Sequence, residues 1–333
     1  MSGVHKRPTL TDVAQLVGVT KMTVSRYLRN PKQVAAKTAE RIQEVIDELG
    51  YVPSRAPDIL SNAKSHAIGV LLPSLTNQVF AELLRGLESV TEVSGYQTML
   101  AHYGYDPKIE ERRIESLLSY NIDGLLLSDR IHTPRTERVI ASAGIPVIEM
   151  VETDDPMNYP VVGFNNREAA RQMVATMLAS GYRQIIYLGA RLDTRTKLKQ
   201  QGYQQAMQEA GFEPHSVLTE QPSSFSLGSE LLRKVLAQYP NCDGIFCTND
   251  DLAVGAVFEC QRQNIAIPKQ LAIAGFHGLD IGQTLTPKLA SVITPREAIG
   301  QKAAEQLLAC LEKDIKPKPM TDLGFQIARG ASI

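Results

Sequence analysis

The chain has 333 residues, which is too long for one domain of average size and predicts two or three domains with sizeable cores. Its 35 basic and 36 acidic residues nearly cancel, so the overall charge alone favours no class of partner. No apolar run reaches membrane-spanning length, and residues 1–10 lack the apolar region of a secretory signal, so we expect a cytoplasmic protein.

Charge is distributed unevenly along the chain. Residues 1–41 contain eight Lys or Arg and two acids, a net charge of +6, so the remaining residues carry −7. A basic head on an acidic body is typical of a nucleic-acid-binding module joined to a domain that does not bind nucleic acid.

Two short helices are predicted near the N-terminus. Thr9 precedes an apolar run, and Asp12 follows three residues later, a pattern similar to a capping box. Gly18 suits the left-handed turn that closes a helix, and Thr20 can cap a second helix two residues further on. The inward face of the first helix consists of Leu10, Val13, Ala14 and Val17.

The second predicted helix has an apolar inward face and a basic outward face. The inward face carries Val24, Tyr27 and Leu28, and the outward face carries Lys21, Met22, Ser25, Arg26 and Arg29. A helix-turn-helix places the start of its second helix in the major groove, so Lys21, Met22 and Arg26 are the candidate base readers. The candidate phosphate contacts are Thr20, Thr23, Ser25, Lys6, Arg7, Arg29 and Lys32. A small helical bundle with a solvated basic face is the alternative interpretation.

A third helix and a hinge complete the head. The helix is predicted from the spacing of Ala39, Ile42, Val45, Ile46 and Leu49, and Gly50 ends it. Residues 51–60 read YVPSRAPDIL, are interrupted by Pro53 and Pro57, and precede the polar stretch SNAKSH. We therefore predict a helix-turn-helix domain over residues 1–50, a hinge over residues 51–66 and a separate body over residues 67–333.

Three stretches resemble the LacI/GalR family of bacterial transcriptional regulators: TLTDVAQLVGVTKMTVSRYL, ELGYVPSRAPDIL and AIGVLLPSLTNQVFAELLRGLE. The resemblance covers nearly the whole chain. It implies that the hinge folds into a short helix on specific DNA and that Leu60, at the matching position, wedges into the minor groove. Pro57 is unusual in that hinge, but it falls in the first turn, where its missing N–H removes no intrahelical bond.

The body alternates short aliphatic runs with amphipathic helices, which predicts parallel α/β sheets buried on both faces. A weak internal sequence similarity between NIDGLLLSD and NCDGIFCTND favours two similar lobes. Ligands of such sheets bind at the carboxyl ends of the strands. The polar residues predicted there are Ser74, Asn77, Asn165, Arg191 to Lys199, Asn249, Asp250 and His277. We expect Asp250 to cap the helix that follows it.

The family resemblance implies a two-lobed, periplasmic-binding-protein-like body with its effector in the cleft. Phe80 matches a position whose ring lines the pocket, although a plain core role remains open. Lys199 matches the position where the family usually holds a ligand-binding arginine, and Asn249 matches a polar ligand contact. Arg195 lies one turn before Lys199, so the two cations share a helical face.

Two departures from the family pattern suggest the chemistry of the effector. His277 and Asn165 stand where the family commonly has aspartates, which bond sugar hydroxyls but repel a carboxylate. Histidine can donate to a carboxylate, and Arg195 and Lys199 can pair with one, so a sugar acid fits. Within the family, GFHGLDIGQ and LGARLDTRTKLKQQGY are similar to the repressors of gluconate utilisation. A satisfied loop histidine is the alternative for His277.

An enzyme of sugar metabolism on the same scaffold is an alternative, but the sequence has no Gly-rich phosphate loop, no G-x-S-x-G elbow and no HExxH. A nonspecific architectural DNA binder has no use for a large ligand-binding body. We therefore predict a repressor with no catalytic residues, which binds a palindromic DNA operator and a sugar-acid effector. The chain ends at Ile333 without the apolar heptads that make some relatives tetramers, so we expect a homodimer. Residues 295–319 are predicted to return to the first lobe.

The four cysteines give no sign of a metal or redox site. Cys242, Cys247, Cys260 and Cys310 form no CxxC pair and have no histidine at zinc-ligand spacing. We therefore expect buried or free thiols in a reducing compartment, with no metal and no cofactor.

Overall fold

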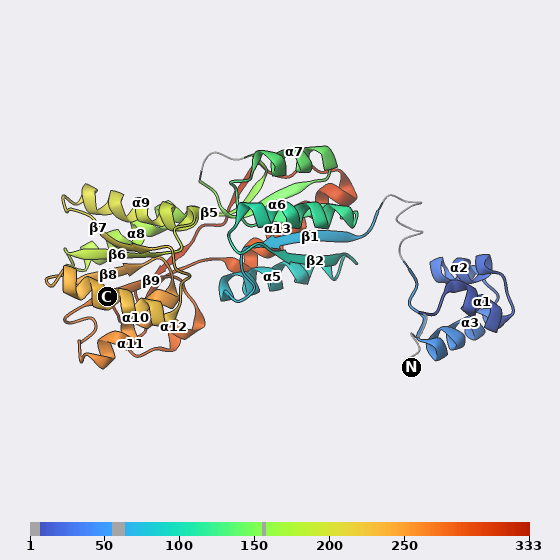
Figure 1. Ribbon diagram of the computed structural model, residues 1–333, viewed down its shortest axis with the longest axis horizontal. Coiled ribbons are helices and arrows are strands. Elements are labelled where there is room, and N and C mark those ends of the chain that lie inside the picture. Colours follow the sequence, from blue (N-terminus) through green and yellow to red (C-terminus); the bar gives the residue numbers. More distant parts are fainter. Residues whose placement is uncertain (1–6, 55–63, 155–157) are drawn as a thin grey trace. The chain divides into compact units, whose positions relative to one another are not determined.

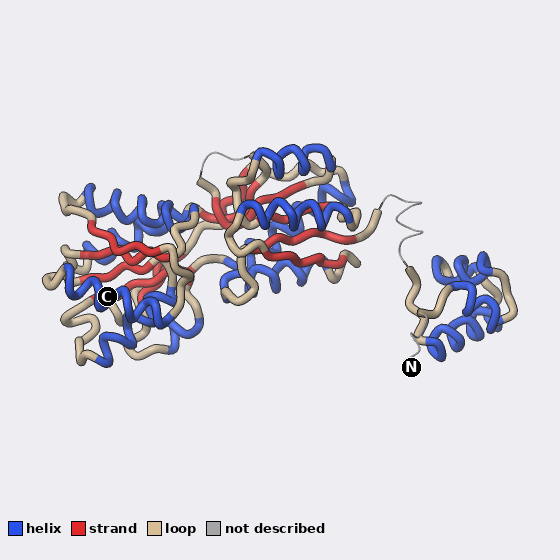
Figure 2. Tube along the Cα trace, in the orientation of Figure 1, coloured by secondary structure: helices blue, strands red, loops and turns tan. Residues whose placement is uncertain are grey.

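The computed structural model describes residues 7–54, 64–154 and 158–333. The chain forms two compact units that divide between Ser65 and His66. The described part of the first unit is helical, whereas the second contains two sheets, as Figure 2 shows. None of the helices formed by the described residues combines the length and apolar character that crossing a bilayer requires.

The first unit is a bundle of three α-helices, α1 (Leu10–Val17), α2 (Lys21–Arg29) and α3 (Ala36–Leu49), with the short 3₁₀ helix η1 (Pro31–Gln33) between the last two. The predicted capping box is present, because the Thr9 side chain accepts from Asp12 N and the Asp12 carboxylate accepts from Thr9 N. Gly18 ends α1 at φ 77°, a conformation that glycine adopts without strain. The fully buried centre of the bundle consists of Val13, Val24, Ile42 and Val45.

The second unit has two lobes, each built on one six-stranded sheet (Figure 1). The first sheet has the order β11-β5-β4-β3-β1-β2, and its strands are β1 (Ala67–Leu72), β2 (Gln97–His102), β3 (Gly124–Leu127), β4 (Val147–Glu152), β5 (Val161–Phe164) and β11 (Met320–Asp322). The second has the order β12-β10-β9-β8-β6-β7, and its strands are β6 (Ile185–Ala190), β7 (His215–Thr219), β8 (Gly244–Cys247), β9 (Ala272–His277), β10 (Ala290–Ile293) and β12 (Gln326–Ala328).

Helices cover both faces of each sheet. The helices of the first lobe are α5 (Gln78–Thr91), α6 (Pro107–Ser119), α7 (Pro134–Ala143) and α13 (Arg296–Lys313), and those of the second are α8 (Asn166–Ala179), α9 (Thr194–Glu209), α10 (Phe225–Gln238), α11 (Asp250–Arg262) and α12 (Asp280–Thr284). Side chains of β1 alternate between the two faces: Val70 packs in the cluster with α5 and α13, and Leu71 packs in the cluster with α6 and α7. Burial on both faces explains why the strands read as continuous aliphatic runs.

The chain passes repeatedly between the lobes. After β10, α13 returns to the first lobe and packs along α5, as predicted for residues 295–319. Two differences from the prediction occur near the C-terminus: β11 was not foreseen, and β12 pairs antiparallel with β10 while the other pairings among described strands are parallel. A three-residue strand such as β11 carries too few residues for a periodic signal.

Candidate functional site

The exposed face of α2 is basic and carries one apolar side chain. Lys21, Met22, Arg26 and Arg29 are exposed, and Met22 keeps 70% of its surface accessible. Arginine and lysine can bond the edge of a guanine, and an apolar side chain can contact a thymine methyl group. The face therefore presents the side-chain chemistry that major-groove reading needs.

The orientation of α2 is fixed from the opposite side. Val24 and Tyr27 are buried in the bundle, and the Tyr27 hydroxyl donates to Gln43 Oε1 at 2.6 Å. At the start of the helix, Thr20 Oγ1 accepts from Thr23 N at 3.2 Å. Because the inward face is anchored, the outward side chains project from a rigid element.

The start of α2 is also electrostatically suited to an anion. Its first turn contains no acidic residue, and Lys21 and Arg26 form no ion pair among the described residues. Free N–H groups and the helix dipole favour a phosphate at such an end. Ser25 and Thr23 are partly exposed nearby, whereas Lys6 and Leu60, also predicted to contact DNA, lie outside the described residues.

A second candidate site lies between the lobes of the second unit, at the carboxyl ends of their strands. Six of the predicted effector residues line it: Asn77, Phe80, Arg195, Lys199, Asn249 and His277. The side chains enclose a space of about 40 Å³, which is enough for one or two water molecules and too small for a sugar acid. A ligand of that size can enter only if the lobes or their side chains move.

Two arginines of the second lobe reach across this cleft to the first. Arg195 is 9% exposed, and its guanidinium donates to the Ser128 carbonyl at 2.7 Å. Arg191 donates to the Tyr105 hydroxyl, with its guanidinium 4.4 Å from the centre of that ring. These contacts connect the two walls directly, so any opening of the cleft must break them.

Lys199 is buried in the floor of the cleft. Its Nζ donates to the Thr248 carbonyl at 3.0 Å and lies 3.2 Å from His277 Nε2. Its Nζ also lies 4.0 Å from the centre of the Phe276 ring. Burial lowers the pKa of Lys199 to about 7. The nearby cations also lower this pKa, whereas the carboxylate of Asp193 raises it.

His277 is held in a strained backbone conformation at the end of β9. Its φ is 106°, and its carbonyl accepts from Arg296, which also pairs with Glu82 of α5 at 2.8 Å. Burial and the neighbouring Lys199 lower the pKa of His277 well below its ordinary value. The ring is therefore neutral, and its Nε2 can accept a hydrogen bond from Lys199.

In the Asn249–Asp250 pair, the predicted place of Asn249 in the cleft agrees with the structure, whereas the capping role predicted for Asp250 is wrong. Asn249 caps α11 by accepting from Leu252 N at 3.1 Å, and its amide donates to Ser223 Oγ at 2.7 Å. Asp250, which was expected to be the cap, instead accepts from Leu279 N and from Ser291 Oγ. Asp250 therefore fixes the loop after His277, while Asn249 both caps the helix and lines the cleft.

Two predicted effector residues are engaged away from the lining. Ser74 Oγ accepts from the backbone of Asn77 and thereby shapes the turn before α5. Asn165 caps α8 by accepting from Glu168 N at 2.8 Å. The lining residues that the sequence did not single out include Tyr105, Val151, Ser223 and Thr248. Asp193 lies within the stretch that the sequence singled out after β6, but Tyr105 and Ser223 follow edge strands whose ends gave no distinct signal.

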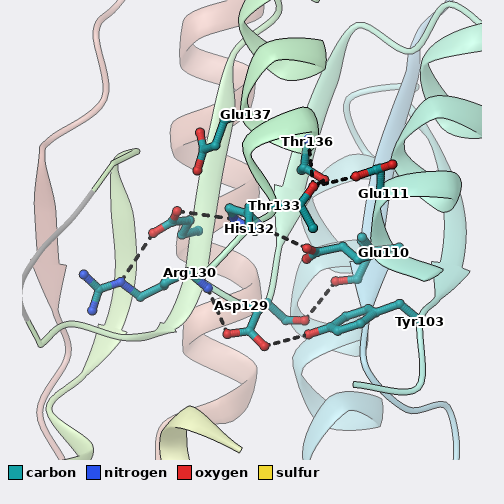
Figure 3. Close-up of polar contacts among 12 residues, drawn as sticks. Tyr103, Glu110, Glu111, Asp129, Arg130, His132, Thr133, Thr136 and Glu137 are labelled. Atoms are coloured by element: carbon teal, nitrogen blue, oxygen red, sulfur yellow. Dashed lines mark hydrogen bonds and ion pairs between the residues drawn. The ribbon is translucent and has the colours of Figure 1, made fainter. Parts of the chain in front are cut away.

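A separate buried cluster of charge in the first lobe contains Glu110, Arg130 and His132 (Figure 3). His132 stands between two carboxylates, with Nδ1 2.9 Å from Glu110 Oε2 and Nε2 3.7 Å from Glu149 Oε1. Arg130 approaches Glu149 at 3.4 Å. Burial alone lowers the pKa of His132, but bonding to the two carboxylates raises the pKa to about 10. Two cations and two anions thus cancel within the cluster.

Family models match both units of the chain. Residues 9–54 match the model of bacterial regulatory proteins of the lacI family. Residues 65–318 match the model of periplasmic binding proteins and the sugar binding domain of the LacI family.

Individual proteins match over nearly the full length. The HTH-type transcriptional regulator GntR of Escherichia coli (strain K12) is 61% identical over 328 residues, which cover 98% of this chain and 99% of that protein. The HTH-type transcriptional regulator IdnR of the same strain is 48% identical and covers 99% of both chains. The crystal structure of a LacI family transcriptional regulator from Silicibacter pomeroyi superposes with a TM-score of 0.92 at 31% identity, over 98% of this chain and 99% of that one.

Proposed function

This chain belongs to the LacI family of bacterial transcriptional regulators, and we propose that it is a repressor whose affinity for its operator is controlled by gluconate or a closely related sugar acid. Family membership makes it a DNA-binding regulator and not an enzyme. The proposal assigns DNA reading to residues 1–50, a hinge to residues 51–66, and effector binding and dimerisation to residues 67–333. A palindromic operator then matches the symmetry of a homodimer in the cytoplasm, associated with the nucleoid.

The imbalance of charge in the cleft carries the effector assignment. Three basic side chains, Arg191, Arg195 and Lys199, line the space, and Asp193 is the only acid among the described lining residues. A carboxylate that binds there forms charge-assisted hydrogen bonds, which are stronger than neutral ones. The amide of Asn249 and the hydroxyls of Ser223 and Thr248 suit the hydroxyl groups of a sugar chain.

Calorimetry of the full chain with gluconate and with glucose tests this assignment. Glucose has comparable hydroxyls and no carboxylate, so we expect gluconate to bind at least tenfold more tightly. Equal affinity for the two sugars would remove the sugar-acid assignment. It would leave the repressor assignment intact, because DNA binding depends on the first unit.

Base reading by α2 is tested by Arg26→Ala. If Arg26 bonds a guanine, the substitution weakens specific binding by about 1–3 kcal/mol and affects random DNA much less. Arg41→Ala is the matched control, because Arg41 is exposed on α3 and paired with Glu44 at 2.9 Å. Equal losses on specific and random DNA would reduce Arg26 to a phosphate contact.

A further inference from the structure

We propose that effector binding is coupled to the uptake of one proton by Lys199. The inference depends on the proposed sugar-acid effector and concerns how pH changes effector binding at the same site. Its basis is the environment of the Lys199 ammonium group, which is buried and lacks a carboxylate at ion-pair distance among the described residues.

The geometry defines which hydrogen bonds the amine makes. An ammonium group can only donate, so in that form the contact of Lys199 with His277 requires an unprotonated Nε2, whereas a neutral amine can also accept there. His277 Nδ1 lies 3.4 Å from Thr294 Oγ1, which suits the tautomer that carries its proton on Nδ1. The Thr248 carbonyl, His277 and the face of the Phe276 ring are all uncharged, so none of these contacts neutralises a buried ammonium group.

Burial favours the neutral amine until an anion arrives, and the surrounding charges act in both directions. The titratable and charged groups that act on the Lys199–His277 pair are Arg191, Asp193, Arg195, Glu152, Arg296 and His277 itself. Of the two acids, Asp193 already pairs with Arg195 at 3.8 Å, and Glu152 accepts from Asn166 at 2.6 Å. Burial is the main cause of the Lys199 pKa of about 7, and Arg195 and Arg191 lower this pKa further, whereas Asp193 and Glu152 raise it.

A carboxylate in the cleft reverses this balance. An anion beside Lys199 stabilises the ammonium form, so the bound state holds a proton that part of the free protein lacks. No proton is needed from the effector, because an ordinary carboxyl group is fully ionised at neutral pH. The proton comes from solvent, and gluconate affinity must therefore fall as pH rises through the pKa of Lys199.

Calorimetry in buffers of different ionisation enthalpy counts the protons. For the full chain with gluconate we expect uptake of about 0.5 proton at pH 7 and about 0.9 at pH 8, with affinity about tenfold weaker at pH 8 than at pH 6. Lys199→Arg is the decisive variant, because arginine remains charged throughout this range. It should bind gluconate with no proton uptake and little pH dependence. Lys197→Arg, at an exposed position of the same helix, should match the wild type.

Each outcome decides one of the two hypotheses. Gluconate binding by the wild type without proton uptake at pH 8 would overturn the coupling and leave the sugar-acid effector standing. Uptake that persists in Lys199→Arg would assign the proton to another group and would also overturn it. If the arginine variant fails to bind gluconate, NMR of the wild-type lysine ¹³Cε signals tests the coupling instead. Without gluconate, one lysine must titrate near pH 7. With gluconate bound, that lysine must no longer titrate near pH 7. Failure of the wild type to bind gluconate at any pH would instead remove the proposed effector.

Discussion

Two clusters of buried charge in the second unit differ in how that charge is balanced. In the first lobe, Glu110, Glu149, His132 and Arg130 cancel one another within contact distance. In the cleft, Lys199 is equally buried, but it contacts neutral acceptors and lies near further cations. A balanced cluster has no need of a ligand, whereas an unbalanced one gains most when an anion binds.

The balanced cluster still serves the cleft, because it fixes the loop that forms one wall. His132 and Arg130 belong to the loop after β3, and the same loop presents the Ser128 carbonyl to Arg195. Asp129 of this loop accepts from the Tyr103 hydroxyl at 3.2 Å. The first cluster therefore contributes rigidity, and under the proposed function the second contributes recognition.

The largest effect is expected from breaking the balanced cluster. His132→Ala leaves two carboxylates buried without their shared partner, so the free energy of unfolding should fall by about 3–5 kcal/mol in urea denaturation. Adding Glu110→Gln removes the carboxylate that is left unpaired, while Glu149 keeps Arg130 as its partner, and should restore part of the loss. A loss below about 1 kcal/mol would mean that the cluster is not a neutralised unit.

Lys199→Met should have the opposite profile. Methionine removes a buried charge while keeping the length of the side chain, so we expect the free energy of unfolding at pH 7 to stay the same or rise. Gluconate affinity should fall more than tenfold, because the effector loses a charged partner. Lys197→Met is the control on the same helix. A Lys199→Met protein that is destabilised and still binds gluconate would contradict the view that the charge in the cleft is unbalanced.

His277→Asp tests the sign of the charge in the cleft with a smaller perturbation. The carboxylate repels the effector but also pairs with Lys199, so we expect gluconate affinity to fall by roughly tenfold. His277→Asn keeps a neutral polar group and should weaken binding less. Operator binding without effector should be unchanged in both variants, as gel-shift titration can measure. Unchanged gluconate affinity in His277→Asp would leave the sugar-acid assignment without support from this residue.

The sequence predicted the positions of the cleft residues better than their partners. Strand-end logic placed Arg195, Lys199, Asn249 and His277 together because parallel strands end at one edge of a sheet. It could not predict that Asn249 rather than Asp250 caps α11, since both residues suit that role. Nor did it reveal the pairing of His132 with Glu110 and Glu149, which come from three separate elements. Contacts between distant segments leave no local periodicity, so only the fold reveals them.

The smallest expected effect is the pH dependence of stability. The slope of the unfolding free energy against pH should have opposite signs for the two clusters. The pKa of His132 is raised to about 10, so its stabilising contribution is complete below its unfolded pKa of about 6.5 and is lost as pH rises towards 10. The pKa of Lys199 is lowered to about 7, so its destabilising contribution is complete below pH 7 and is relieved as pH rises towards 10.5. Between pH 7 and 9, the difference in unfolding free energy between wild type and variant should therefore fall with pH for His132→Ala and rise for Lys199→Met. Each slope is expected to be about 1 kcal/mol per pH unit. Denaturation of the three proteins at pH 7, 8 and 9 measures both slopes, and slopes of the same sign would show that the two clusters do not differ in their balance of charge.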